Sequence, residues 1–346
     1  MADSQFPKYN DYRNRFIRES TKANLQILSI KIEGQDLDSN PLYQDYAFLD
    51  RKQKITTVIM SGLHGAEGYI GSDIQDELIK NISNSSIQTN LLFVHAVNPY
   101  GMAWYRRTNQ NNVDLNRNAA FSTKKIENNK FSIFLPFLSS SSIFELILQW
   151  PLALVKALAL GARDTSQIIA SGQYEYQKSI FFGGFETEKE VSNLLSTIQK
   201  LAPNTETFRV IDIHTGLGPS AFDSLLVSGD SRTEIQYFEK ILEPKHLMIL
   251  SKDPKYYKAN GLLEDAFRAK FGIENVHYVT QEFGTLPFYK VLSCLILENS
   301  WFYQGRQHDK KRFQLSLDTF YPKEPNWKTQ CIQAGIKLFS KVVSTQ

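Results

Sequence analysis

A histidine and a glutamate stand three residues apart just after a predicted strand. His64 and Glu67 follow the apolar, β-branched run 55–60 and a turn-prone Ser-Gly pair. On the first turn of a helix, positions i and i+3 share one face, so the imidazole and the carboxylate can point at one place. Both are zinc ligands, and a third ligand would leave one coordination position for water. Alone, so short a pattern is more typical of a capping glutamate beside an incidental histidine.

A polar stretch rich in asparagine and arginine follows the predicted buried strand 91–97. It contains Arg106 and Arg107, and then the run 112–118, Asn-Val-Asp-Leu-Asn-Arg-Asn. Arginine captures a carboxylate through two parallel hydrogen bonds, and a neighbouring asparagine adds a neutral donor. A solvated loop is the alternative for any single arginine. Beside a histidine and a glutamate at a strand end, the pattern favours an anion-binding role.

Two further strand ends carry groups that suit hydrolysis. The run 210–216 ends in His214 and a glycine turn, with Asp212 on the same strand face, where it could orient an imidazole. The run 278–285 carries Glu282 near its carboxyl end. A carboxylate that takes a proton from water is what metal-assisted hydrolysis requires. A metal-free histidine and a solvated glutamate are the alternatives for these positions taken singly.

These four pieces, in this order, resemble the zinc carboxypeptidase (M14-like) superfamily, which includes the metallocarboxypeptidases and the aspartoacylase and succinylglutamate desuccinylase deacylases. The resemblance is closest to the branch called DUF2817, and it runs from about residue 55 to about residue 300. It also covers Gly172-Gln173-Tyr174 and Phe182-Gly183-Gly184. The matching residues are His64, Glu67, Arg107, Asn116, Arg117, His214 and Glu282.

The resemblance implies a metal site and a base. His64, Glu67 and His214 would bind one zinc ion, Zn²⁺, and Glu282 would activate the attacking water. The peptidases also place a mobile tyrosine over the substrate, and no matching motif is found here. Tyr256 and Tyr257 precede Glu282 at a suitable separation. The missing motif weakens the assignment to peptidases without affecting the zinc site.

The resemblance also implies how substrate is held. Arg107 would polarise the scissile carbonyl and steady the oxyanion, as preorganised positive charge does. Arg106 competes for this role, because spacing cannot separate adjacent residues. Asn116 and Arg117 would grip a substrate carboxylate.

Strands alternate with helices along the chain. Strands are predicted near 55–60, 91–97, 208–214, 246–250 and 277–283, and helices near 71–80, 188–200, 233–242, 262–270, 287–297 and 328–343. This alternation predicts an α/β fold, a three-layer α/β/α sandwich around a mixed, mostly parallel sheet. The candidate residues fall at or just past strand carboxyl ends, where open α/β sheets place their sites.

Composition and length fit one ordinary globular domain covering residues 1–346. The net charge of +3 argues against a nucleic-acid binder. Two cysteines make no disulfide framework, and the first residues contain no apolar signal region, so we expect a cytoplasmic protein.

The most apolar segment of the chain lies at 131–160, inside a region at about 122–185 that we interpret as a helical insertion. Proline, serine and charged residues interrupt the segment, whereas a membrane span needs roughly 20 continuous apolar residues. We expect two buried helices joined at the serines 139–142, and no membrane contact. Docking on a membrane surface, a contact between copies in an oligomer, and a wall of the cleft are the alternatives.

Three functions are compatible with the sequence. The first is a carboxypeptidase-type hydrolase that uses a zinc-activated water to cleave an amide or peptide bond near a free carboxylate of a small peptide. The second is a deacylase of N-acyl amino acids, which the Asp-Ile-His-Thr form around His214 favours. The third is a non-catalytic binding protein that has kept the fold.

Overall fold

The structure is a computed structural model that describes residues 6–82, 87–121, 128–252 and 259–344. Its centre is an eight-stranded sheet with the order β1-β2-β4-β3-β5-β8-β6-β7. The strands are β1 Gln26–Gln35, β2 Pro41–Leu49, β3 Ile55–Ser61, β4 Asn90–His95, β5 Thr207–Gly216, β6 Asp223–Val227, β7 Leu247–Ile249 and β8 Val276–Gly284.

The four central strands, β4, β3, β5 and β8, run parallel. The pairs β1–β2, β2–β4 and β6–β8 are antiparallel, and β6–β7 is parallel. The sheet is therefore mixed, with a parallel centre. The register between β5 and β8 sets His214 opposite Glu282, so these two side chains leave the sheet at neighbouring positions.

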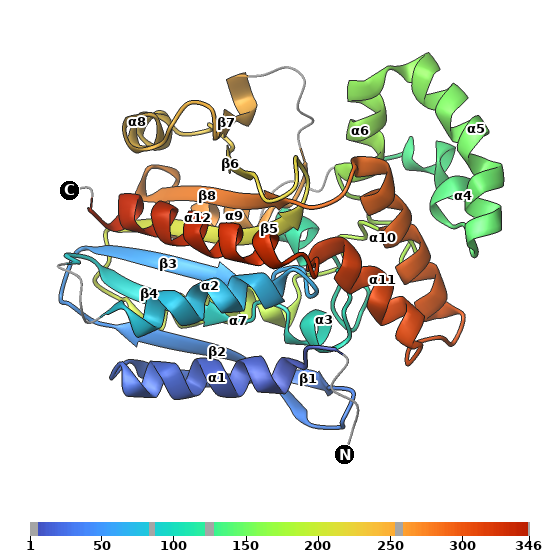
Figure 1. Ribbon diagram of the computed structural model, residues 1–346. Helices are drawn as coiled ribbons and strands as arrows, with labels where there is room; N and C mark the ends of the chain where they lie inside the picture. Colours follow the sequence, from blue (N-terminus) through green and yellow to red (C-terminus); the bar gives the residue numbers. More distant parts are fainter. Residues whose placement is uncertain (1–5, 83–86, 122–127, 253–258, 345–346) are drawn as a thin grey trace.

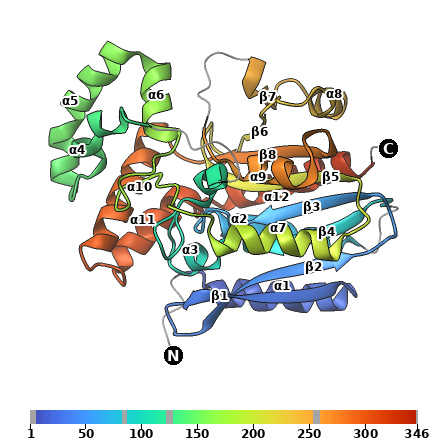
Figure 2. The same ribbon diagram turned by 180° about the vertical axis from the view of Figure 1, so that it is seen from behind.

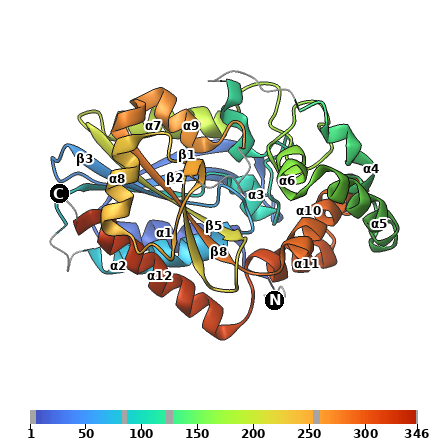
Figure 3. The ribbon, with the colours of Figure 1, turned by 90° about the horizontal axis from the view of Figure 1, so that it is seen from above.

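Helices cover both faces of the sheet (Figures 1, 2 and 3). They are α1 Tyr9–Lys22, α2 Gly68–Lys80, α3 Pro99–Ala103, α4 Leu135–Leu138, α5 Ile143–Leu160, α6 Ala162–Ala170, α7 Lys189–Leu201, α8 Arg232–Ile241, α9 Leu263–Phe271, α10 Phe288–Tyr303, α11 Lys310–Phe320 and α12 Pro325–Ser344.

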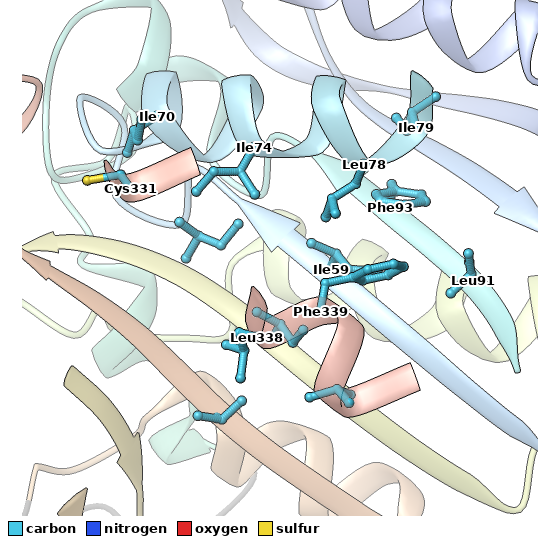
Figure 4. Close-up of a cluster of buried hydrophobic side chains, with 14 of the residues drawn as sticks. Ile59, Ile70, Ile74, Leu78, Ile79, Leu91, Phe93, Cys331, Leu338 and Phe339 are labelled. Carbon is cyan, nitrogen blue, oxygen red and sulfur yellow. The ribbon is translucent and has the colours of Figure 1, made fainter. Parts of the chain in front are cut away.

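Alternate residues of each central strand pack into two separate cores, one on each face of the sheet. Ile59 and Ile211 pack against α2 and α12 on one face (Figure 4), whereas Val58 and Val210 pack against α7 and α9 on the other. This period of two is what a strand buried on both faces requires. The three-layer α/β/α architecture predicted from the sequence is confirmed.

The elements missed from the sequence lie mostly at the margins. The strands β1, β2 and β6 and the helices α1 and α11 were not predicted. In β1 only Ile32 is fully buried, because this strand forms one edge of the sheet. Of α1, mainly Tyr9 and Phe16 reach the core. Helix α1 thus carries few apolar positions, whereas β2 was missed although it is buried along most of its length.

The helices α4, α5 and α6 stand at one side of the molecule, away from the sheet (Figures 1 and 3). As expected, serines separate α4 from α5. The expectation that both helices are buried is wrong for α5, since only Leu146 and Ala153 of this helix are fully buried. The reason is geometric: one narrow face of α5 packs on the remaining helices, and nothing among the described residues covers the opposite face.

Candidate metal centre

The candidate residues gather at the carboxyl ends of β3, β5 and β8. His64 lies in the loop after β3, and Glu67 is the residue preceding α2. His214 and Glu282 belong to β5 and β8 themselves. Parallel strands bring their carboxyl ends to one edge of the sheet, so residues far apart in the sequence meet there.

Gly65 allows the loop of His64 to pack directly on α3, the short helix that follows β4. A Cβ atom at Gly65 would lie 1.8 Å from the carbonyl carbon of Gly101, which is far inside van der Waals contact. The Gly65 amide donates a hydrogen bond to the carbonyl of Arg106, at 3.0 Å. Glycine at this position therefore brings His64 against the arginine-rich segment.

Three potential metal ligands converge in this buried region. Ligand atoms of His64, Glu67 and His214 all lie within 4.8 Å of one another, and all three residues are buried. The two Nδ1 atoms are 3.2 Å apart. Glu67 reaches both rings, with Oε1 3.1 Å from Nδ1 of His64 and Oε2 3.2 Å from Nδ1 of His214.

The far nitrogen of each imidazole contacts an aspartate. Nε2 of His64 is 3.2 Å from Asp114, and Nε2 of His214 is 2.9 Å from Asp212. Because carboxylates accept hydrogen bonds, these contacts assign the ring protons to Nε2 and leave both Nδ1 lone pairs facing the same point. Such carboxylate–histidine pairs are the usual support of metal-bound histidine. This donor set fits a divalent metal ion.

The electrostatics of the centre favour a positive charge between the ligands. Burial opposes ionisation of Glu67, but the imidazoles of His64 and His214 hold the pKa of this carboxyl below its ordinary value. Burial likewise opposes protonation of His214, yet Asp212 and Glu67 raise the pKa of its imidazole well above the usual range. A metal ion would supply the positive charge that these groups favour.

Glu282 stands beside this group as a carboxylate with an unusual pKa. Its side chain is buried, and Oε1 accepts a hydrogen bond from the amide of Leu217, at 3.0 Å. Burial, and then the negative charge of Glu67, raise the pKa of Glu282 to about 7. A carboxyl with this pKa can take up and release a proton near neutral pH, as a general base must.

The two adjacent arginines occupy different surroundings. Nε of Arg107 donates to Asp114, at 2.8 Å, and Nη1 lies 3.8 Å from Oε1 of Glu67. Arg106 is fully buried and bonds instead to Glu298, at 3.0 Å. Of the two, only Arg107 is shown in contact with the metal-ligand group.

Arg117 is engaged by the end of α6. Its Nε and Nη2 both donate to the carbonyl of Ala170, at 3.0 and 2.7 Å, and Nη1 donates to the carbonyl of Asn116. The side-chain oxygen of Asn116 accepts from the amide of Leu263. Arg117 thus joins the segment of the candidate site to the α4–α6 region, and its role toward substrate stays a prediction.

Three contacts at the site involve residues that we did not assign from the sequence. Asp114 bonds both His64 and Arg107, and it was visible within the run 112–118 as the one carboxylate. Tyr278 donates to Asp212, at 2.7 Å, and Phe181 lies under the guanidinium of Arg107, at 5.3 Å. No local signal identifies either of these two. Tyr256 and Tyr257 lie outside the described residues.

Comparisons with known proteins agree with this fold. The family model described as "Protein of unknown function (DUF2817)" matches residues 6–334. No curated protein matches the chain.

Solved structures similar to this chain include thrombin activatable fibrinolysis inhibitor, with 13% identity, a TM-score of 0.50, and coverage of 99% of this chain and 75% of that one. Carboxypeptidase A from Helicoverpa armigera has 13% identity, a TM-score of 0.48, and coverage of 88% and 74%. A metallo-carboxypeptidase from Pseudomonas aeruginosa has 13% identity, a TM-score of 0.47, and coverage of 96% and 68%. The chain therefore belongs to the DUF2817 family, and its fold is similar to that of thrombin activatable fibrinolysis inhibitor.

Proposed function

We propose that this protein is a zinc-dependent hydrolase that cleaves an amide or peptide bond close to a free carboxylate. The observation that carries the proposal is the convergence of two Nδ1 atoms and the Glu67 carboxylate on one point, with both Nε2 atoms held by aspartates. Structural zinc sites use four protein ligands, whereas three ligands are typical of catalytic sites with an open position.

Zinc, when bound, would act as a Lewis acid that polarises a carbonyl and increases the acidity of water. His64, Glu67 and His214 would hold it. Asp114 and Asp212 would fix the two imidazoles in the ligating tautomer. Glu282 would accept the proton of the attacking water and later pass it to the leaving nitrogen, which its pKa of about 7 supports.

Arg107 would donate hydrogen bonds to the oxygen that becomes negative when the carbonyl is attacked. Its contact with Asp114 and its position over Phe181 restrain the guanidinium, and a restrained donor needs little reorganisation as charge develops. Arg117 and Asn116 would hold the substrate carboxylate. Since Arg117 already donates to Ala170, carboxylate binding would either use its remaining N–H groups or draw it from that carbonyl.

A deacylase of N-acyl amino acids is the second candidate. The specific feature in its favour is the Asp-Ile-His-Thr motif, in which Asp212 contacts His214 at 2.9 Å. The two candidates share the metal, the base and the carboxylate and differ in the acyl side of the substrate.

The test is an assay of the purified, zinc-loaded protein on short peptides and N-acyl amino acids, each supplied both as the free acid and as the amide. Turnover of peptides supports the first candidate, and turnover of N-acyl amino acids supports the second. If the metal binds but no acid substrate of either kind is cleaved, both candidate activities are wrong and a non-catalytic binding protein is favoured.

A further inference from the structure

Helix α5 presents an uninterrupted apolar surface to solvent. Among the described residues, it is the one helix long and apolar enough to cross a membrane, with a mean hydropathy of 1.7 and only 11% of its residues buried. Eight of its large apolar side chains are more than half exposed, with 72% for Phe144 and 74% for Leu158. A core helix of a soluble domain would have this composition but not this exposure.

The exposed residues form a continuous arc. They are Ile143, Phe144, Ile147, Leu148, Pro151, Leu152, Leu154, Val155, Leu158 and Ala159. At about 100° per residue, these positions together cover roughly half of the helix circumference, and no polar residue falls among them. We call these ten residues the α5 arc.

The polar residues of α5 are confined to one narrow strip beside the packed face. They are Glu145, Gln149 and Lys156. Glu145 accepts from the amide of Ser141, at 2.8 Å, and Lys156 donates to the carbonyl of Ile133, at 2.7 Å. The charges of this helix are thus directed back toward the protein, and the α5 arc itself carries none.

The size of the α5 arc sets it apart from ordinary surface. Eight large apolar side chains that are each more than half exposed amount to several hundred Å². The largest apolar patch on a typical monomer is about 300–600 Å² and is often functional. In Figures 1, 2 and 3, α5 lies at the outer border of the molecule, where a large planar surface can reach it.

We propose that the α5 arc docks the protein on a lipid bilayer, with α5 lying in the plane of the membrane interface. A rigid protein face meets a helix along a stripe of roughly 100°, which would leave much of the arc in water. Acyl chains and headgroups rearrange around a convex helix and can cover all of it.

A second copy of this chain fits the α5 arc less well than lipid does. Two crossed α5 helices would cover only one stripe of each arc, which falls short of the roughly 800 Å² per partner of a stable interface. The arc also lacks the tyrosine, tryptophan and arginine side chains that dominate binding between proteins, and no charge on it could select a charged partner.

An in-plane helix suits the connections of α5 better than a membrane-spanning one. Gly161 alone separates α5 from α6, which contains Arg163 and Asp164. Leu146 and Ala153 hold the packed face of α5 in a core shared with α4, α6 and α10. If α5 spanned the bilayer, its packed face would have to leave this core, whereas docking in the membrane interface leaves the core intact.

The first test is flotation of the full-length protein with vesicles of phosphatidylcholine and phosphatidylglycerol. The wild-type protein should bind. In a double variant, Leu148→Glu with Val155→Glu, the partition coefficient onto the vesicles should fall at least tenfold, because two charges would enter the apolar interface. The matched control is Ile273→Glu, at a residue that is also exposed but lies outside α5; this variant should bind like the wild type.

Circular dichroism must show that all three proteins are folded. Wild-type protein that stays unbound, or a double variant that binds equally well, overturns the proposal. It is also overturned if the lipid-free wild type sediments as a dimer and the double variant sediments as a monomer, because the α5 arc would then bind a second copy.

The second test measures the orientation of α5. Phe144→Trp and Leu158→Trp place a fluorophore at either end of the helix, about 21 Å apart at 1.5 Å per residue. Lipids brominated at a fixed acyl position should quench both tryptophans to the same extent if α5 lies in the plane. Quenching of one tryptophan alone, with bromines near one leaflet surface, contradicts an in-plane helix.

Discussion

The candidate metal centre and α5 depart from the usual burial pattern in opposite directions. At the centre, His64, Glu67 and His214 are each about 3% exposed although they are polar. On α5, Phe144 and Leu158 are more than 70% exposed although they are apolar. Buried polar groups persist where they are paired or bind metal, and large exposed apolar surfaces persist where something else covers them.

The two regions differ in whether their side chains find partners within the chain. The centre is supported from within, because each polar group has a named partner in the chain. The α5 arc lacks such a partner among the described residues. Changes at the centre should therefore alter chemistry and metal binding, whereas changes on the arc should alter association and leave the folded chain nearly as stable as before.

The largest effect is expected from Glu282→Gln. The amide cannot accept a proton from water, so turnover of the substrate identified by the panel should fall roughly 100- to 10,000-fold. Zinc content, measured by elemental analysis, should remain near one per chain. Near-normal turnover would transfer the role of base to another group, with Asp212 the next candidate.

Within α5, buried and exposed leucines should differ sharply. Leu146 is 4% exposed and Leu148 is 61% exposed. Leu146→Ala should lower the free energy of unfolding by about 2–5 kcal/mol through the lost contacts and the cavity. Leu148→Ala should change it by no more than about 0.5 kcal/mol. Chemical denaturation measures both, and similar losses would mean that the α5 arc is packed in solution.

Metal affinity should reveal the support given by the aspartates. His214→Ala removes a ligand and should abolish most zinc binding. Asp212→Ala leaves the ligands in place but frees the ring of His214, so affinity should fall about 10- to 100-fold. Competition with a chromogenic chelator measures both. Full zinc occupancy in the His214 variant would refute the ligand assignment.

A smaller effect is expected from His95, a buried histidine outside the centre. Its ring stacks near Tyr9 and Phe16, and burial lowers the pKa of this imidazole from 6.5 to about 3. The unfolded chain therefore binds a proton in a range where the folded protein does not. The free energy of unfolding should fall by about 2 kcal/mol from pH 7 to pH 5 through this group.

His95→Gln should remove that part of the acid sensitivity, whatever its effect at pH 7. His308→Gln is the control for the substitution itself, because His308 is exposed whereas His95 is buried. Equal pH dependence in the wild type and the His95 variant would mean that this imidazole becomes protonated in the folded protein.

The sequence by itself predicted the parallel centre of the sheet and the place of the candidate site. Residues 55–60 and 208–214 are apolar on both strand faces, which only a strand between two helical layers requires. Because parallel strands end at one edge, His64, His214 and Glu282 were expected together from the sequence. The edge strand β1 was missed because only its Ile32 is fully buried, and β6 was missed because it is only five residues long.

Only the tertiary structure decided which neighbours act at the site and which surface is left open. Arg106 and Arg107 are equivalent in sequence, but the packing of Arg106 against Glu298 leaves Arg107 beside Glu67. Tyr278 of β8 reaches Asp212 on the neighbouring strand β5. An apolar helix has the same sequence whether it is covered or bare, because burial depends on what packs against it and not on its own composition. That is why α5 was expected in the core and was found at the surface.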